Sequence, residues 1–440
     1  MLKDCCSFQE GYVNPTQTIR SYFNGPIKWL RASDLNEYLV YKTEKTLSIE
    51  GFNSAGKSAF LFKKNTIAIS KSGTIGSLGI LKEEMCGNRA VININVNSDI
   101  SDLYYVFYTL KYKKNEIVSK AGGSIQKNLY VSALETITLN HNDLLTQKKI
   151  ASVLSSLDSK IELNNRINAE LEAMAKTLYN YWFVQFDFPN PEGKPYKSSG
   201  GKMVWNEELK RGIPEGWEKG SLSDLGEIIG GSTPPREISE YFTNNSTAWI
   251  TPKDLSLNQG NKFITKGELD VSEKGIKAAS LNIMPKGTIL LSSRAPIGYL
   301  AISREKVTTN QGFKSFAPNK GYSKEYVYYS VKNMIPTIEN NAAGSTFKEI
   351  SGSTLKSISI CLADKAIANK YTETASSVFN RQNLLELENQ QLSSLRDWLL
   401  PMLMNGQVKV SSVLEEEVGE IMVAVPRERH GEKKTEFKYQ

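Results

Sequence analysis

The chain has little of the residue types from which most metal and hydrolytic sites are built. Its 440 residues include 2 histidines and 4 cysteines. The cysteines form no CxxC pair, so the sequence offers neither a zinc-ligand spacing nor a disulfide framework, and its thiols are typical of a reducing cytoplasm. A histidine-based catalytic triad is equally unsupported. The pattern predicts a binding protein rather than an enzyme, with no metal, cofactor or catalytic residue of its own.

Long apolar runs are also missing. No stretch approaches the roughly 18 residues that a membrane-spanning helix needs, and residues 1–6 lack the apolar core of a signal peptide. We therefore expect a cytoplasmic protein. The net charge of +7 permits an anionic partner such as nucleic acid, but a charge of this size also fits simple surface solubility.

What the sequence does contain is a duplication with a period of about 221 residues. Residues 29–35 return as 249–255, and residues 66–76 return as 288–298. A repeat this long indicates two related domains rather than a solenoid of small units. Two similar but non-identical domains suit a ligand with two similar but non-identical halves.

Each copy combines a mixed α+β pattern with a long helical one. Short β-rich runs such as 66–70 and 91–95, punctuated by glycines, precede a helical stretch at 103–112. From residue 143 the apolar spacing changes to 4-3-4, without Gly or Pro up to 188, which predicts a helix about 60 Å long. The predicted fold class is α+β, with two globular recognition domains, each followed by a long helix. The predicted boundaries are first domain 1–142, first helix 143–186, linker 187–213, second domain 214–362, second helix 363–406 and tail 407–440.

The two long helices are expected to pair with each other as an antiparallel coiled-coil spacer. An amphipathic helix must bury its apolar stripe, and 60 Å exceeds the diameter of a 140-residue domain. Asn164, Asn168 and Asn389 fall at seam positions, where a polar side chain costs stability but specifies register. The alternative is that each helix packs only on its own domain.

Residues 51–58 match the phosphate-loop pattern G-x-x-x-x-G-K-[ST] letter for letter. That mechanism needs a strand before the loop and a substantial helix after it. Only residues 59–65 separate the match from the next predicted strand, and the second copy has no Gly-Lys-Ser at this place. The match is therefore interpreted as coincidental. A nucleotide-binding enzyme built on Gly56, Lys57 and Ser58 remains an alternative, as does a helical scaffold that binds no DNA.

Several motifs, taken in order, resemble one family. They are Ile-Pro-Glu-Gly-Trp at 213–217, Gly-Gly-Ser-Thr-Pro at 230–234, Trp-Ile-Thr-Pro-Lys-Asp-Leu at 249–255, Thr-Asn-Gln-Gly-Phe at 309–313 and Gly-Ser-Thr-Phe-Lys at 344–348. Tyr-Trp-Phe at 181–183 and Leu-Leu-Pro-Met-Leu at 399–403 resemble the ends of its spacer helices. Together they resemble the DNA-specificity subunit of type I restriction-modification systems, over residues 1 to about 410. The first copy lacks the Pro-x-Gly-Trp opening.

The resemblance implies a subunit that recognises a split, asymmetric site in double-stranded DNA, one half per domain, across a gap set by the helices. It implies assembly with two methyltransferase (modification) subunits and, in the full complex, two restriction (motor-nuclease) subunits. S-adenosylmethionine, ATP and magnesium are then expected on those partners and not on this chain. For two domains that face the same side of B-DNA, the half-sites should lie about 34 Å apart.

The candidate DNA contacts are loop residues that pair between the two copies and carry side chains able to reach base edges or phosphates. In the first copy they are Arg31, Ser33, Lys71, Ser72, Thr74, Asn88, Arg89, Ser124, Gln126 and Lys127. In the second copy they are Thr251, Lys253, Ser293, Arg294, Asn310, Gln311, Ser345, Thr346 and Lys348. Pairs that differ, such as Arg89 and Gln311, are what two unlike half-sites would require. The alternative for Asn88 and Asn310 is that they only cap turns.

Overall fold

The computed structural model describes residues 1–123, 127–140, 142–344 and 348–410. It divides into two compact units. Unit 1 comprises Met1–Ile161 with the segment from Gln391 onward, and unit 2 comprises Glu162–Gln390. Each long helix is therefore shared between the two units. The boundaries expected from the sequence kept each long helix as one segment, because they followed the change in apolar spacing, whereas the units are defined by which residues contact one another. No helix in the described part of the chain is both long and apolar enough to cross a membrane.

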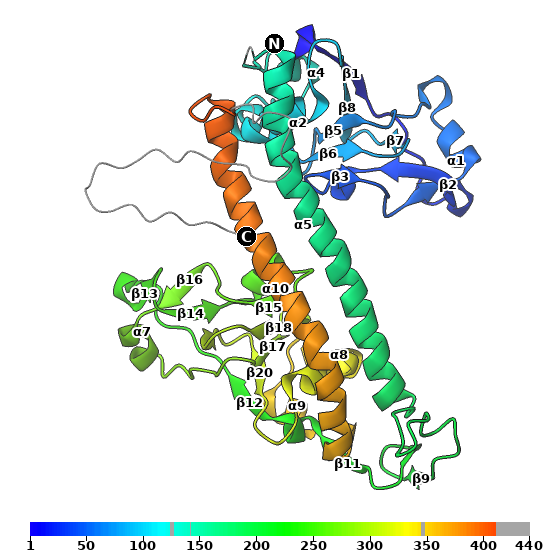
Figure 1. Ribbon diagram of the computed structural model, residues 1–440, viewed down its shortest axis with the longest axis vertical. Coiled ribbons are helices and arrows are strands. Elements are labelled where there is room, and N and C mark those ends of the chain that lie inside the picture. Colours follow the sequence, from blue (N-terminus) through cyan, green and yellow to red (C-terminus); the bar gives the residue numbers. More distant parts are fainter. Residues whose placement is uncertain (124–126, 141, 345–347, 411–440) are drawn as a thin grey trace, which may run out of the picture. The chain divides into compact units, whose positions relative to one another are not determined.

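Unit 1 is built on a five-stranded sheet in the order β1-β8-β5-β6-β3 (Figure 1). Its strands are β1 (Cys6–Glu10), β3 (Leu39–Val40), β5 (Thr66–Ser70), β6 (Leu78–Leu81) and β8 (Val91–Val96). A smaller sheet has the order β4 (Thr46–Leu47), β2 (Phe23–Leu30), β7 (Cys86–Gly87). The short helices are α1 (Ile49–Asn53), α2 (Leu103–Tyr112), α3 (Lys114–Ser119) and α4 (Val131–Glu135), with single 3-10 turns at Leu2–Asp4, Arg20–Tyr22, Ala32–Asp34 and Gly56–Ser58.

Unit 2 repeats this plan. Its main sheet has the order β12-β20-β17-β18-β15, which matches the order in unit 1 element for element. The strands are β12 (Glu227–Gly230), β15 (Phe263–Ile264), β17 (Ile289–Ser293), β18 (Ile297–Ser303) and β20 (Lys314–Ala317). The second sheet is β13 (Phe242–Thr243), β16 (Leu269–Val271), β14 (Thr247–Ile250) and β19 (Val307–Thr309). The helices are α6 (Pro252–Leu257), α7 (Glu273–Ala278), α8 (Lys324–Asn340) and α9 (Gly352–Ser357). The duplication predicted from the sequence is thus a duplication of topology.

The core of each unit lies between the main sheet and its helices. In unit 1, Ile69 and Ile80 of the sheet form one buried cluster with Phe107 of α2 and Leu154 of a long helix. Asp102 caps α2 by accepting a hydrogen bond from the Tyr105 backbone N–H, which satisfies one of the free donors of the first turn. Both β5 and α2 begin and end where the sequence predicts them.

The two long helices are α5 (Leu144–Tyr179) and α10 (Lys365–Met404). A short π-helical turn, Asn180–Val184, follows α5, and α10 continues past Pro401 by three residues. In unit 1, Arg396 donates to Asp158 at 2.6 Å. In unit 2, Asn164 donates to Asn389 at 2.9 Å. Residue numbers fall along α10 as they rise along α5, so the helices pair in antiparallel fashion, and Asn164 and Asn389 do face each other at the seam.

The expected linker is folded as part of unit 2. It contains the hairpin of β9 (Met203–Asn206) and β10 (Arg211–Pro214). The Phe188 ring stacks on the Trp217 ring with centroids 5.3 Å apart. Strand β11 (Glu218–Ser221) then pairs with β21 (Ser359–Leu362) and closes the domain. Prolines and glycines in this segment predicted a linker between the domains, but its aromatic side chains provide apolar surface to bury. Residues 411–440 of the expected tail lie outside the described residues.

Candidate nucleic-acid interface

Four loops meet at one end of the main sheet in unit 1. They are residues 11–14 after β1, residues 71–76 after β5, residues 88–90 before β8, and the residues around the isolated bridge between Gly122 and Asn128. Backbone hydrogen bonds join them, since Lys71 donates to Ala90 O at 2.8 Å and accepts from Leu129 N at 2.8 Å. Lys71, Ser72, Asn88 and Arg89 line one hollow of about 430 Å³. The structure therefore brings these four predicted residues together.

Unit 2 uses the same backbone scheme. Ser293 donates to Gly312 O at 2.7 Å and accepts from Ile350 N at 3.1 Å. The counterpart of the Gly122–Asn128 bridge joins Ala343 to Glu349. Asn310 accepts the Gly312 N–H at 2.9 Å, just as Asn88 accepts the Ala90 N–H at 3.0 Å. Both asparagines thus cap a turn, so the carbonyl oxygen of each has a structural role.

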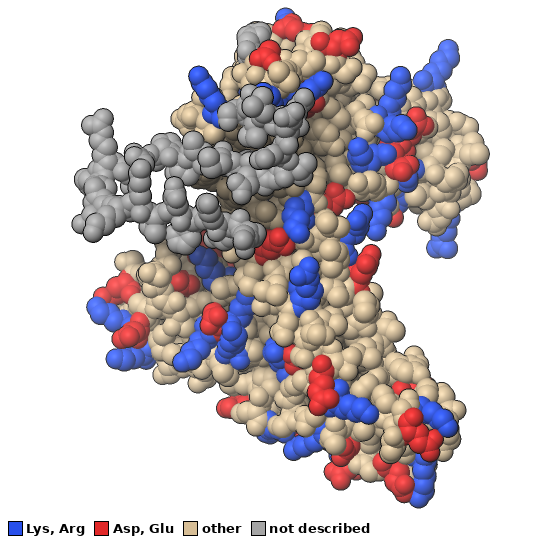
Figure 2. Space-filling model, viewed as in Figure 1, with Lys and Arg blue, Asp and Glu red and all other residues tan. Residues whose placement is uncertain are grey.

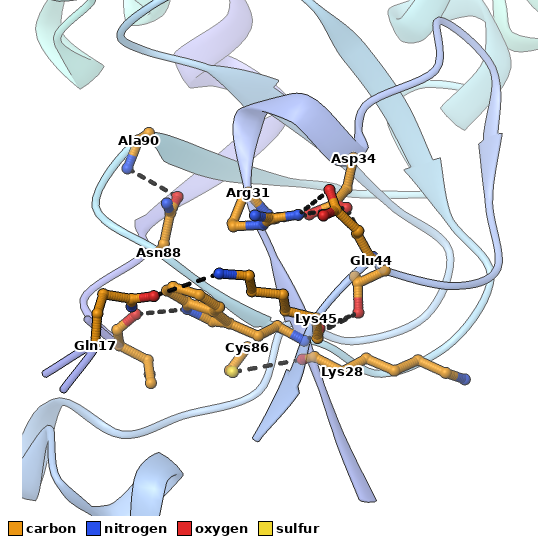
Figure 3. Close-up of polar contacts among 12 residues, drawn as sticks. Gln17, Lys28, Arg31, Asp34, Glu44, Lys45, Cys86, Asn88 and Ala90 are labelled. Carbon is orange, nitrogen blue, oxygen red and sulfur yellow. Dashed lines mark hydrogen bonds and ion pairs between the residues drawn. The ribbon is translucent and has the colours of Figure 1, made fainter. Parts of the chain in front are cut away.

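Arg31 and Ser33 lie beside this loop set because β2 and β7 run parallel. Asn88 donates its backbone N–H to Leu30 O at 2.9 Å. Figure 3 shows the Arg31 guanidinium directed at Asp34 and Glu44, with nitrogen–oxygen distances of 3.3 and 2.7 Å. Burial acts to lower the pKa of the Arg31 guanidinium, but the Glu44 and Asp34 carboxylates together outweigh it and raise that pKa. Glu44 is exposed, so a phosphate can compete for the guanidinium.

Thr251 and Lys253 occupy the corresponding place in unit 2. The Thr251 hydroxyl caps α6 by accepting the Asp254 backbone N–H at 3.4 Å, and it donates to the Asp254 carboxylate at 2.6 Å, so this side chain stabilises the fold locally. Lys253 pairs with Glu268 at 2.6 Å, and both side chains are exposed. Surface pairs of this kind contribute little and exchange readily for another anion. Lys253 can therefore exchange Glu268 for a phosphate, whereas the Thr251 hydroxyl is already used in its bonds to Asp254.

Ser293 is a correction to the predicted contacts. Its side chain is fully buried, with 0% exposed, because it ends β17 and the strand's flanking loops cover both sides. Lys71 holds the same backbone position in unit 1 but is long enough to emerge and pair with Glu10 at 2.8 Å. In this structure a DNA surface has no access to the Ser293 hydroxyl, and we remove it from the set.

The remaining predicted residues are exposed or half-buried, or they lie outside the described residues. Ser33, Thr74, Arg89, Lys127, Gln311 and Lys348 are exposed, and Arg294 is half-buried beside Glu349. Ser124, Gln126, Ser345 and Thr346 lie outside the described residues. Figure 2 shows basic and acidic side chains interspersed on the visible face. Any preference for nucleic acid therefore rests on these loops more than on bulk charge.

The geometry adds residues that the sequence reasoning missed. Thr233 donates to Gln311, and Tyr12 and Tyr130 line the hollow in unit 1. A careful alignment of the two copies could have identified Tyr130, because a serine, Ser351, holds its place in the second copy.

The phosphate-loop match does not form a phosphate loop. Gly51 lies inside the five-residue α1, where an added Cβ would meet Tyr22 O at 2.2 Å, and Gly56–Ser58 form a single 3-10 turn. Strand β5 follows at Thr66, and no substantial helix intervenes. Burial also raises the pKa of the nearby Cys86 thiol to about 12, so this thiol stays protonated and is a poor nucleophile.

Comparison with known proteins places this arrangement in a family. The family model described as type I restriction modification DNA specificity domain matches residues 1–173 and 214–394. The MjaIX specificity subunit of Methanocaldococcus jannaschii is 46% identical over 165 residues, which cover 36% of this chain and 38% of that subunit. The HindI specificity subunit of Haemophilus influenzae is 27% identical over 373 residues, covering 72% of this chain and 80% of that one. A crystal structure of a type I restriction-modification S subunit from M. genitalium shares the fold, with a TM-score of 0.54 at 17% identity over 91% of this chain and 94% of the other.

Proposed function

This chain belongs to the type I restriction-modification DNA-specificity family, and from that premise we propose that it recognises a bipartite, asymmetric DNA site with one half read by each unit. The observation that carries the proposal is the repeated four-loop arrangement. The same backbone hydrogen bonds present different side chains in the two units, with Arg89 in one and Gln311 in the other. One scaffold with two sets of side chains is what two unlike half-sites require.

The side chains divide into reading and positioning roles. Arg prefers the O6 and N7 atoms of guanine, and Gln pairs with adenine in the major groove. Arg89 and Gln311 are both exposed, and we assign them to base edges. Lys127, Lys348 and Lys253 extend from neighbouring exposed positions and suit phosphates, which set orientation without reading sequence.

The paired helices act as the ruler between the half-sites. Asn164 is fully buried against Glu388 and Asn389, and a buried polar pair of this kind opposes slippage of the helices. A fixed register gives a fixed gap.

Catalysis is assigned to partner subunits. We propose that this chain directs two methyltransferase subunits and, in a restriction complex, two motor-nuclease subunits to the site. S-adenosylmethionine, ATP and magnesium would be bound by those partners. The one motif on this chain that the sequence offered as an alternative, the phosphate-loop match, forms a single 3-10 turn at Gly56–Ser58 and lacks the geometry to hold a nucleotide.

The decisive experiment is the genome-wide methylation pattern of cells that express this chain with its methyltransferase subunit. We expect a split motif that disappears when this chain is omitted. Exchange of residues 214–362 for those of another family member should change one half of the motif and leave the other intact. A motif that persists without this chain, or that changes in both halves, would contradict the proposal.

A further inference from the structure

The hollow in unit 1 has two aromatic walls that the second unit does not share. Tyr12 and Tyr130 both line it and expose 44% and 51% of their surface. Because both tyrosines line one hollow, they offer it two aromatic faces, each with a polar hydroxyl, on which a ligand with an apolar face can pack.

Tyr12 is an extra residue relative to the second copy. Val13 donates its backbone N–H to Gly87 O, and Ser232 donates to the corresponding oxygen of Thr309. Tyr12 stands between Gly11 and Val13, whereas Ser232 follows Gly231 directly. The ring of Tyr12 is held in place, edge-on to Phe60 at 6.5 Å between centroids, and its hydroxyl lies 3.4 Å from Glu10.

Tyr130 occupies a position where local stability favours another residue. It is the N-cap of α4 and makes no side-chain cap. In the second unit Ser351 holds the same place, and its hydroxyl accepts the Thr354 backbone N–H at 3.1 Å. Serine is among the preferred N-cap residues and tyrosine is not. Within the part of the chain that the structure describes, the Tyr130 side chain makes no cap hydrogen bond, and a position that breaks a local rule in this way is a candidate for function.

Charged groups complete the hollow. Lys71 and Glu10 are paired at 2.8 Å along one side, and Arg89 is exposed at its rim. Aromatic faces next to a guanidinium are the combination that proteins use to hold a nucleobase, since the rings stack on the base and the cation contacts its edge or its phosphate.

We propose that this hollow receives one nucleobase of the first half-site after that base has left the duplex stack, with the rings of Tyr12 and Tyr130 against its faces and Arg89 at its edge, and that it thereby determines the identity of that base pair. This rests on the proposed function. The second unit has a serine, Ser351, at the Tyr130 position and no counterpart of Tyr12. It therefore reads its half-site without a pair of tyrosines that stack on a base.

The test uses the assembled complex of this chain with its methyltransferase subunit and a duplex carrying the motif found in the methylation experiment. The key variant is Tyr130→Ser, because it installs the residue of the second copy and improves the helix cap, so the variant is expected to fold. Base stacking on an aromatic side chain is worth enough for a loss of roughly 10-fold in affinity at fixed salt. We expect that loss, together with lost discrimination at one base pair of the first half-site only. Tyr130→Phe, which keeps the ring and removes only the hydroxyl, should retain both properties and serves as the matched control.

A second arm identifies the contact. When the base at the affected position is replaced by an abasic residue, wild type and Tyr130→Ser should bind equally, because the group that the ring contacts is gone. A difference that persists on abasic DNA overturns the proposal. So does Tyr130→Ser binding within 2-fold of wild type, or weakening all duplexes alike, non-specific DNA included. If the wild-type complex itself yields no split motif, it is the proposed function that fails, before this test begins.

Discussion

The ammonium group of Lys262 lies 2.8 Å from the carboxylate of Glu172, and only 3% of the lysine side chain is exposed. Glu172 belongs to α5, whereas Lys262 immediately precedes β15 of the recognition domain. Lys262 also donates to Gln382 of α10 at 2.6 Å and lies 3.8 Å from the centre of the Phe379 ring. One buried cation thus joins both long helices to the recognition fold of unit 2.

Removal of Lys262 alone should be costly. Lys262→Met leaves Glu172 in a largely buried site without its main counter-charge, and loss of one partner of a buried pair typically costs about 3–5 kcal/mol. Because Lys332 also contacts Glu172 at 2.7 Å, we expect the lower end of that range. Urea unfolding of the full chain measures it.

The control is the double variant Lys262→Met with Glu172→Gln. It should recover part of the loss, since the unpaired charge is gone. If the double variant is as unstable as the sum of the two single variants, the two groups are not coupled.

The same lysine predicts a pH dependence. Burial lowers the pKa of Lys262 to about 8 from its usual 10.5, although Glu172 opposes the shift. A folded-state pKa below the unfolded one means that the folded protein releases the proton first as pH rises. Stability contributed at this site should therefore increase between about pH 8 and pH 10.5. Unfolding free energies of wild type and Lys262→Met across this range give the difference, which should grow in favour of wild type. If the difference in unfolding free energy between wild type and Lys262→Met does not change with pH, the pKa of Lys262 is not lowered in the folded protein.

Each recognition domain should respond to mutation independently. Arg89→Ala should relax one base position in the first half-site, and Gln311→Ala should do so in the second, each by about 1–3 kcal/mol of discrimination. Methylation of a library of duplexes with single base changes reports both halves at once. Lys127→Ala, a phosphate-type control, should weaken all sequences equally and reduce the salt dependence. Cross-talk, in which Arg89→Ala alters the second half-site, would count against one domain per half.

Lengthening the helices should lengthen the gap. Because α5 and α10 are antiparallel, an insertion in one helix alone would break the Asn164–Asn389 contact. Four residues inserted in both, after Ile161 and after Gln390, keep the pairing in each unit and add about 6 Å. The methylated motif should gain about two base pairs of gap at about 3.4 Å each, with both half-sites unchanged. An unchanged gap would mean that the helices are not the ruler.

Lys57 should be dispensable. The Lys57→Ala variant is expected to give the wild-type motif and the wild-type level of methylation, because Gly56–Ser58 form only a 3-10 turn. ATP binding by the purified chain that is lost in this variant would restore the nucleotide-binding alternative.

Much of the architecture could be predicted from the sequence because it depends on local patterns. The 3.6-residue apolar spacing and the lack of Gly and Pro predicted α5, and β-rich alternation predicted β5 and β8 near their observed bounds. The duplication required only comparison of the chain with itself. Periodicity was less reliable for individual seam positions. Asn164, Asn168 and Asn389 were all predicted at the seam, but only Asn164 is fully buried, and the other two are partly exposed.

The sequence by itself determined the two-fold plan, the long helices and the loops that carry recognition. Only the tertiary structure decided which loop residues reach the surface, and the pair Lys71 and Ser293 shows the reason. The two hold the same backbone position, yet one emerges to meet Glu10 and the other is fully buried. Side-chain length and the packing of flanking loops settle that outcome, and neither can be read from spacing along the chain. The clustering of Tyr12 with Tyr130 likewise depends on β1 and the start of α4 meeting at one end of a sheet, a contact between segments more than a hundred residues apart.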